Sequence, residues 1–277
     1  MNEQSTIKRS NDNHRPEEKT HLVADLVMGL RFFSRLPTGD HPHERPELNR
    51  MAMALPLASL IIGLAPALVL ALLCALGTPS YLAATLSVFA LILATGAMAE
   101  DGLADAADGL FGGMTAERRL EILKDSRHGS YGVAALCLFI LARVTALGAA
   151  GAINPLAAGG IWLASTILAR SGSLLLALRL PPARPDGASA AVGRLRKVPF
   201  VVGLVFAVLL AFVLAAPFTR GIGLILSLAL AGLIAWGWSH LCRALVGGQT
   251  GDLIGALQGL MEMAILTVFV TLLHRLA

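Results

Sequence analysis

Long apolar segments separated by short polar connections make up most of the chain. A membrane-spanning helix needs about 20 predominantly apolar residues, and seven segments approach or exceed this length: 51–76, 81–99, 132–153, 156–180, 198–218, 221–245 and 252–273. Residues 22–37 combine two phenylalanines with Arg31 and Arg35, a pattern typical of a helix in the membrane interface. The pattern therefore predicts an all-α fold: a polytopic integral membrane helical bundle of about seven transmembrane helices plus an N-terminal amphipathic, interfacial helix.

Composition supports this class of protein. Hydrophobic residues make up 56% and charged residues 14% of the chain, whereas charged residues are about a quarter of a typical soluble domain. Residues 1–21 are the exception, because they are polar and charged and contain no apolar core of a signal peptide. We expect 1–21 to be a disordered cytosolic tail and 22–277 to be a single membrane-embedded catalytic domain.

The distribution of Lys and Arg predicts the orientation of the bundle. Of the 22 basic residues, 18 lie in the N-terminal region and in the connections on the same side of the predicted bundle. Because cytoplasmic connections carry the excess of Lys and Arg, the N-terminus and the polar motifs are expected in the cytoplasm. Topology thus accounts for the pI near 9.3, and no nucleic-acid partner is expected. The three cysteines are widely separated, which excludes a disulfide framework and metal-ligand spacing.

Acidic residues are concentrated in one connection. Seven of the 18 acidic residues lie between Glu100 and Asp125. If the preceding helix continues through this segment, Asp101, Asp105 and Asp108 share one helical face at positions i, i+4 and i+7. The face is either a solvated helix end neutralised by nearby Arg and Lys or a site for a divalent cation, since clustered carboxylates suit Mg²⁺ or Mn²⁺. The interspersed glycines, which let a ligand approach closely, favour the metal site.

The segment after this motif offers further polar groups. Asp125 lies 17 residues beyond Asp108; it either adds a fourth carboxylate to the cluster or forms an ion pair with Lys124 or Arg127. Residues 126–132 then supply a guanidinium, hydroxyls and open backbone amides at the start of a span, which suits phosphate binding, although a plain turn with an interfacial tyrosine has the same composition. His128 receives no role.

Two more motifs and three intramembrane residues complete the polar inventory. Residues 180–187 are rich in proline and lead to a basic segment, and residues 247–252 form a glycine-rich turn ending in Asp252. Asp252 is either a helix N-cap or a residue of the metal or phosphate site. Ionisable residues inside spans are functional candidates by default. Arg143 and Arg170 either counter a substrate phosphate, extend to the membrane interface or pair internally, with Glu262 as a structural partner for one of them.

Together these motifs resemble the cobalamin synthase, or adenosylcobinamide-GDP ribazoletransferase, family. The resemblance rests on residues 100–109, 124–132, 182–187 and 247–252, which occur in this order, and on Ser-Arg-Leu-Pro at 34–37, where the family usually has Thr-Arg-Leu-Pro. It extends from about residue 26 onward. His128 departs from the family pattern, in which an aliphatic residue is more usual.

The resemblance implies the last steps of adenosylcobalamin biosynthesis. The ribose 3′-hydroxyl of α-ribazole or α-ribazole 5′-phosphate attacks the cobinamide-linked phosphorus of adenosylcobinamide-GDP, and GMP leaves. The family uses Mg²⁺. The implied metal ligands are Asp101, Asp105, Asp108 and Asp125, with Asp105, Asp108 and Asp125 also catalytic. The implied substrate-binding residues are Arg35, Arg127, Ser130, Tyr131, Asp186, Thr250 and Asp252.

Two alternatives and several partners follow from the same residues. A CDP-alcohol phosphotransferase shares the spacing of Asp105, Asp108 and Asp125, but Gly112–Gly113 and Gly129 depart from its signature. A cation-coupled transporter would use the intramembrane charges, yet the acids gather at one face rather than at the midplane. The expected partners are the two substrates and the lipid bilayer, and a homo-oligomer stays open. The expected location is the bacterial inner membrane, with the active site facing the cytoplasm.

Overall fold

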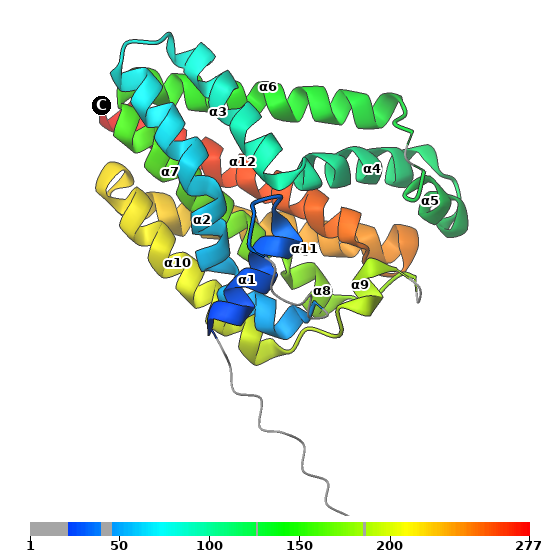
Figure 1. Ribbon diagram of the computed structural model, residues 1–277. Helices are drawn as coiled ribbons and strands as arrows, with labels where there is room; N and C mark the ends of the chain where they lie inside the picture. Colours follow the sequence, from blue (N-terminus) through cyan, green and yellow to red (C-terminus); the bar gives the residue numbers. More distant parts are fainter. Residues whose placement is uncertain (1–21, 40–45, 126, 185–186) are drawn as a thin grey trace, which may run out of the picture.

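The computed structural model describes residues 22–39, 46–125, 127–184 and 187–277, and its regular elements there are helices. The predicted tail 1–21 and Asp186 lie outside these residues. The helices, coloured along the chain in Figure 1, are α1 (Leu22–Phe33), α2 (Leu48–Ala75), α3 (Ser80–Thr95), α4 (Met98–Gly112), α5 (Ala116–Ile122), α6 (Ser130–Ile153), α7 (Pro155–Ser173), α8 (Leu175–Arg179), α9 (Ala188–Ala191), α10 (Lys197–Thr219), α11 (Ile222–Val246) and α12 (Gly251–Leu276).

Six segments of the described chain are long and apolar enough to cross a membrane. They are Leu48–Ala75, Ser130–Ile153, Pro155–Arg179, Lys197–Thr219, Ile222–Val246 and Gly251–Leu276, and a seventh span results if α3 and α4 count as one bent span. The prediction of an all-α, multi-pass membrane protein is confirmed. α1 precedes the spans and carries Asp25, which is buried against Arg50 of α2 at 2.6 Å.

The bend between α3 and α4 corrects one expectation from the sequence. The predicted span 81–99 ends early, because Gly96 and Ala97 both adopt positive φ angles, 65° and 59°. That conformation is uncommon for a residue with a β-carbon, and it turns the axis of α4 by 87° from that of α3. The acidic segment therefore does not continue the preceding helix but forms a helix of its own, in which Asp101, Asp105 and Asp108 keep their shared helical spacing.

The core of the bundle is α7. In its candidate span 89% of the residues are buried, compared with 28% to 39% for the spans of α2, α6, α10 and α11. A helix that is apolar all round is expected to lie inside the protein, and α7 packs against α2, α10 and α12. The other spans therefore leave one apolar side for lipid.

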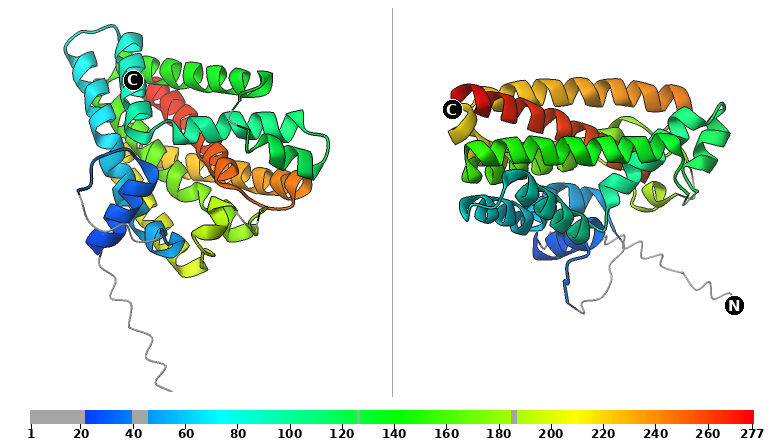
Figure 2. Two further views of the ribbon diagram at one scale, coloured as in Figure 1. Left: turned by 45° about the vertical axis from the view of Figure 1, so that its right-hand side comes forward. Right: turned by 90° about the horizontal axis from the view of Figure 1, so that it is seen from above.

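Glycines let the acidic helix approach α12 closely. In both views of Figure 2, α4 runs beside α6 and α12. A β-carbon on Gly102 would lie 2.9 Å from the carbonyl oxygen of Asp252 and 3.3 Å from the α-carbon of Gly255. Small residues at such crossings allow two backbones to pack against each other. This contact brings α4 to the first turn of α12, where the glycine-rich turn 247–252 ends.

Candidate functional site

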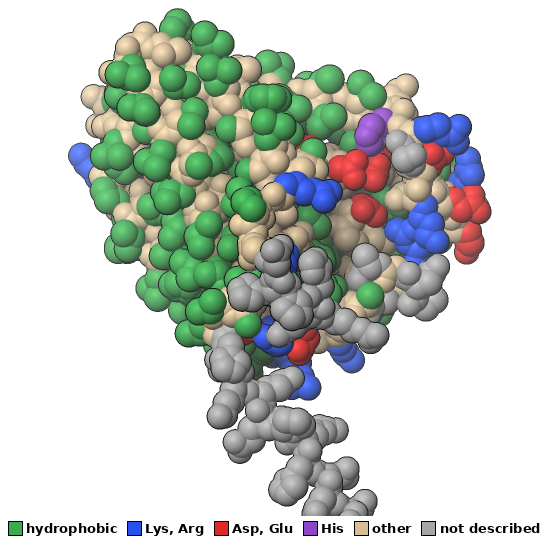
Figure 3. Space-filling model, viewed as in Figure 1, with side chains coloured by type: hydrophobic (Ala, Val, Ile, Leu, Met, Phe, Trp, Pro, Cys, Tyr) green, Lys and Arg blue, Asp and Glu red, His purple; other side chains and the backbone are tan. Residues whose placement is uncertain are grey.

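The exposed face of α4 carries a carboxylate and imidazole cluster, hereafter the acidic cluster, formed by Asp101, Asp105 and His128. Figure 3 shows acidic side chains gathered beside a histidine on this face. His128 Nδ1 lies 3.5 Å from Asp105 Oδ1, and its Nε2 lies 3.9 Å from Asp101 Oδ1. Among the described residues, these three place one ligand atom each within 4.8 Å of one another. Carboxylate and imidazole donors at this separation are able to share one divalent cation.

Negative charge in the acidic cluster is only partly compensated. Asp105 lies outside the six long apolar helices, and the pKa of its carboxyl is raised to about 6, first by burial and then by the charges of Asp101 and Asp252. Desolvation and like charges both disfavour the ionised form of a carboxyl. A bound cation would supply the missing positive charge, and the carboxylate oxygens of Asp101 and Asp105 are donors of the kind that Mg²⁺ takes.

Asp252 reaches the acidic cluster from the start of α12. The N-cap of this helix is Thr250, whose hydroxyl accepts a hydrogen bond from the amide of Leu253 at 3.3 Å and lies 3.3 Å from Asp252 Oδ2. The sequence left open whether Asp252 is the N-cap, and the structure gives that position to Thr250. Arg184 Nη2 lies 3.5 Å from the Asp252 carboxylate. The Asp252 carboxylate thus lies near the acidic cluster and beside the guanidinium of Arg184.

A short backbone bridge joins the proline-rich segment 180–187 to the glycine-rich turn 247–252. The amide of Ala183 donates to the carbonyl of Gln249 at 2.8 Å, and the amide of Gln249 donates to the carbonyl of Pro181 at 2.9 Å. Gly248 is required at this point, because a β-carbon there would lie 2.6 Å from the carbonyl oxygen of Pro181. The bridge explains how Arg184, about 70 residues before Asp252 in the sequence, comes to lie beside it.

Asp108 holds the N-terminus of α6. Its two carboxylate oxygens accept hydrogen bonds from the amides of Gly129 and Gly132, at 2.6 Å and 2.9 Å, and the residue is 7% exposed. A β-carbon on either glycine would collide with this carboxylate. Negative charge at a helix N-terminus is favourable. The structure therefore gives Asp108 a definite partner at α6, adjacent to the acidic cluster but outside the group of three.

Asp125 forms the ion pair that the sequence offered as one of two alternatives. Its carboxylate lies 2.6 Å from Arg127 Nη2 and accepts from Arg127 Nε at 3.0 Å. Hydrogen bonds from Arg127 lower the pKa of the Asp125 carboxyl to about 2. The structure does not bring Asp125 into the group of Asp101, Asp105 and His128.

Three further predicted substrate-binding residues, Arg35, Ser130 and Tyr131, belong to the described chain. Arg35 is exposed at the α3–α4 bend, where its amide donates to the carbonyl of Ala94 at 2.7 Å and its side chain lies against Gly96. Ser130 and Tyr131 are the exposed first residues of α6, and the Tyr131 ring lies 6.2 Å from that of Phe111. Asp186 lies outside the described residues.

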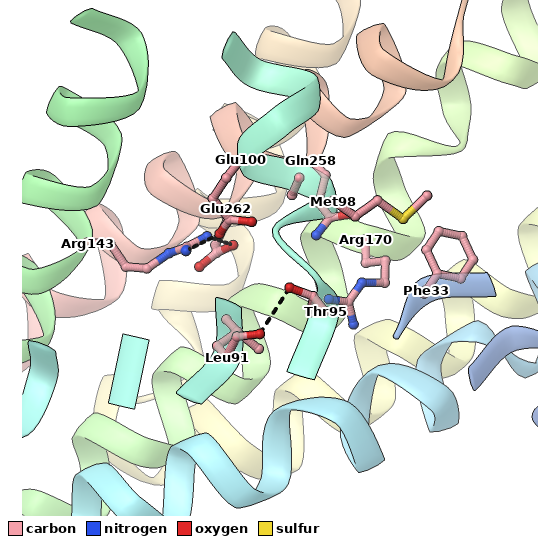
Figure 4. Close-up of a pocket in the computed structure, with 10 residues that line it drawn as sticks. Phe33, Leu91, Thr95, Met98, Glu100, Arg143, Arg170, Gln258 and Glu262 are labelled. Atoms are coloured by element: carbon pink, nitrogen blue, oxygen red, sulfur yellow. Dashed lines mark hydrogen bonds and ion pairs between the residues drawn. The ribbon is translucent and has the colours of Figure 1, made fainter. Parts of the chain in front are cut away.

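A second group of charges, hereafter the buried triad, lies between α4, α6 and α12 and consists of Glu100, Arg143 and Glu262. Arg143 is fully buried and donates to Glu100 Oε1 at 2.6 Å and to Glu262 Oε2 at 2.9 Å, as Figure 4 shows. Its guanidinium also lies 4.2 Å from the centroid of the Phe139 ring. The predicted structural role of Glu262 as a partner of an arginine is confirmed. The triad joins α4, α6 and α12, the three helices that also carry the acidic cluster, Asp108's amide partners and Asp252.

Arg170 extends the buried triad toward a small cavity. The residue is 3% exposed, and its Nη1 has no hydrogen-bond partner among the described residues. The cavity is lined by Arg170, Glu100, Gln258 and Thr95 together with apolar side chains of α1, α3 and α4 (Figure 4). Trp162 Nε1 donates to Glu262 Oε1 at 3.3 Å. Two carboxylates and two guanidinium groups thus lie together around this cavity.

Two members of these groups were missed by the sequence reasoning. Glu100 was read only as part of the acidic segment, but each helical residue is rotated by about 100° from its neighbour, so Glu100 faces α6 and α12 while Asp101 faces outward. His128 was given no role because it departs from the family pattern. Its position between Arg127 and the α6 N-terminus was the signal that it would meet the α4 face.

The fold and these polar groups define a class: a polytopic membrane protein with buried ion pairs and a carboxylate cluster at one end of its helices. A sequence model of the cobalamin-5-phosphate synthase family matches residues 25–270. The chain therefore belongs to this family, as the motifs predicted, and the expectation of a transferase is confirmed.

Individual relatives support the same assignment. The adenosylcobinamide-GDP ribazoletransferase of Azorhizobium caulinodans is 43% identical over 89% of this chain and 95% of its own length. That of Xanthobacter autotrophicus is 44% identical over 86% of this chain and 92% of its own, and that of Bradyrhizobium diazoefficiens is 42% identical over 90% and 94%. No solved structure matches the chain significantly.

Proposed function

We propose that this protein joins adenosylcobinamide-GDP to α-ribazole or α-ribazole 5′-phosphate and releases GMP. A bond forms between the ribose 3′-oxygen and the cobinamide-linked phosphorus, and the bond from that phosphorus to the oxygen bridging to GMP breaks. Membership of the family carries this proposal, since the named relatives are ribazoletransferases that match over more than nine-tenths of their length.

The acidic cluster is the proposed site for Mg²⁺. Asp101, Asp105 and His128 would hold the ion, because their ligand atoms lie within 4.8 Å of one another and Asp252 lies close enough to raise the pKa of Asp105. A divalent cation bound there would neutralise charge on phosphate oxygens and help to align the attacking hydroxyl with its leaving group.

The protein's own groups would bind and orient the substrates. Arg184 beside Asp252, and Arg127 with Ser130 at the start of α6, offer guanidinium and hydroxyl donors to phosphate oxygens. Asp108 fixes the first turn of α6 through two amides, so the donors of that turn are held in place before substrate binds. One carboxylate of the acidic cluster would accept the proton of the ribose hydroxyl.

The proposed location is the bacterial inner membrane, with the acidic cluster on the cytoplasmic side. This orientation rests on the distribution of Lys and Arg, of which 18 of 22 lie on the side of the N-terminus. Soluble substrates would then reach the site without crossing the membrane.

The test is GMP formation by purified protein in nanodiscs supplied with adenosylcobinamide-GDP and each form of ribazole. We expect equal amounts of GMP and of a cobalamin product with Mg²⁺, and neither with excess chelator. A well-folded protein that forms neither product contradicts the proposed reaction. Full turnover in chelator would leave the reaction standing but contradict the metal site. Glu121→Gln, an exposed acid outside the acidic cluster, serves as a control and should retain full turnover.

A further inference from the structure

A basic cavity lies at the start of α10. Arg194, Arg196 and Lys197 line an open space of about 560 Å³ together with Asn49, Leu178 and Leu195. All three basic side chains are exposed, and within the described chain none of them forms an ion pair with an acidic residue. Three positive charges within four residues therefore meet at one cavity, and no carboxylate of the described chain lines it.

The backbone that carries these charges is held firmly. The side chain of Asn49 donates to the carbonyl of Arg194 at 3.1 Å and accepts from the amide of Arg196 at 2.8 Å. The amide of Leu48 also donates to the carbonyl of Val192 at 2.9 Å. These bonds fix the segment against the first turn of α2, so the backbone that carries the basic side chains has a defined position.

The cavity borders a surface suited to acyl chains. α10 begins at Lys197 and has the highest mean hydropathy of the candidate spans, 2.9. Directly beyond the basic residues, Val198 is 71% exposed and Val201 and Val202 are each 49% exposed. The N-terminus of this 23-residue helix adds partial positive charge at the same place. Cationic groups and exposed apolar side chains are thus continuous along one helix.

We propose that this cavity binds the phosphate headgroup of an anionic phospholipid, with the acyl chains lying along the exposed valines of α10. Basic pockets between spanning helices on the cytoplasmic side favour anionic headgroups. A substrate phosphate would have the same charge, but the cavity is built from α2, α8 and α10, whereas the acidic cluster lies on α4 and at the start of α6. In Figure 1 the start of α10 lies at the lower end of the molecule, and α4 and α5 extend to the right.

The test is lipid retention measured by native mass spectrometry, with protein released from micelles containing phosphatidylglycerol or phosphatidylcholine. We expect one phosphatidylglycerol per chain to be retained in preference to phosphatidylcholine. Arg196→Gln with Lys197→Gln should lower that affinity about tenfold, since each cation near an anionic surface contributes to binding. The matched control, Arg118→Gln with Arg275→Gln, removes the same charge from exposed positions elsewhere and should leave retention unchanged.

Three results would overturn the proposal. Equal retention of the two lipids by the unchanged protein would show that no headgroup is recognised, and this comparison needs no variant to fold. Unchanged retention by the Arg196 and Lys197 double variant would remove the cavity as the site. Displacement of the lipid by GMP, with a raised KM for adenosylcobinamide-GDP in the double variant, would assign the cavity to substrate phosphate instead.

Discussion

Glu100 and Asp101 are neighbours in the sequence but belong to two groups of charges that differ in almost every physical respect. The side chain of Glu100 is 5% exposed and pairs with Arg143, whereas that of Asp101 is 62% exposed and faces Asp105 and His128. In the buried triad, two carboxylates share one guanidinium and Arg170 adds a second positive charge. In the acidic cluster, the carboxylates of Asp101 and Asp105 lie near each other, and the His128 imidazole faces both of them.

The two groups differ in how their negative charge is compensated. A buried ion pair must be compensated internally, because an isolated charge in an apolar interior is very costly. In the acidic cluster, Asp101 is exposed to water, and burial of Asp105 together with the charges of Asp101 and Asp252 raises the pKa of the Asp105 carboxyl to about 6. One face of α4 thus pairs with α6 and α12 through Glu100, and another face carries the carboxylates of the proposed metal site.

Breaking the buried triad should have the largest effect. Arg143→Met leaves Glu100 and Glu262 buried without their cation, and loss of one partner of a buried ion pair typically costs about 3–5 kcal/mol. We expect a large drop in the thermal unfolding temperature in detergent, with loss of folded protein. Arg118→Met, which removes an exposed pair with Glu121, is the control. Equal unfolding temperatures for the two variants would contradict the structural role of the triad.

Breaking the acidic cluster should affect turnover rather than stability. Asp105→Asn removes a proposed metal ligand, and loss of one electrostatic contact at a reacting centre typically lowers kcat about 100-fold or more. The thermal unfolding temperature should not fall, because the substitution also relieves the repulsion of Asp105 with Asp101 and Asp252. GMP formation and thermal unfolding would be measured on the same preparation. A variant that keeps wild-type turnover would remove Asp105 from the site.

Separating α4 from α12 should produce an intermediate effect. A β-carbon in Gly102→Ala would press on the backbone of Asp252, so α4 and α12 must move apart; overpacking of this kind costs about 1–3 kcal/mol. We also expect a higher Mg²⁺ concentration for half-maximal GMP formation, because Asp252 moves away from Asp105. Gly232→Ala, at a position where nothing lies within 4 Å of the added carbon, should not weaken either property.

Acid should weaken metal binding through Asp105. Because the folded-state pKa is about 6, the carboxyl is ionised at pH 7 and increasingly protonated below pH 6, and a proton competes with the cation for it. Between pH 7 and pH 5 the Mg²⁺ requirement should rise about tenfold. Without cation, the same carboxyl lowers stability above about pH 6, and this cost is relieved as the pH falls toward the unfolded value of 3.8. A pH-independent Mg²⁺ requirement would speak against Asp105 as a ligand.

The smallest expected effect is at Asp125. Its partner Arg127 has an 88% exposed side chain, and ion pairs at an exposed surface contribute little to stability because water screens them. Asp125→Asn should therefore change GMP formation by no more than about threefold if the ion pair is its only contact. A loss as large as that expected for Asp105→Asn would support the catalytic role that the family resemblance implied for Asp125.

The fold class and the family were predictable from the sequence for clear reasons. Apolar length and basic asymmetry are properties of the whole chain that do not depend on side-chain geometry. The bend at Gly96 and Ala97 was not predictable, because tertiary packing holds an alanine at positive φ. The partner of Asp108, 21 residues away at Gly129, and the presence of Glu100 in the buried triad likewise depend on how three helices meet. The metal and the catalytic roles stay predictions.

The place of Glu262 in the chain has a consequence for how the protein is made. Chains are synthesised from the N-terminus, and their spans enter the membrane in that order. Arg143 and Arg170 are therefore inserted about 90–120 residues before Glu262 is available. Until α12 joins the bundle, Glu100 is the acidic member of the triad that is present, and Asp252 has not reached α4. The packing of α12 thus neutralises the buried charges and completes the polar end of the bundle in one step. A chain released from the ribosome before this step should be degraded by quality-control proteases and should show no partial activity.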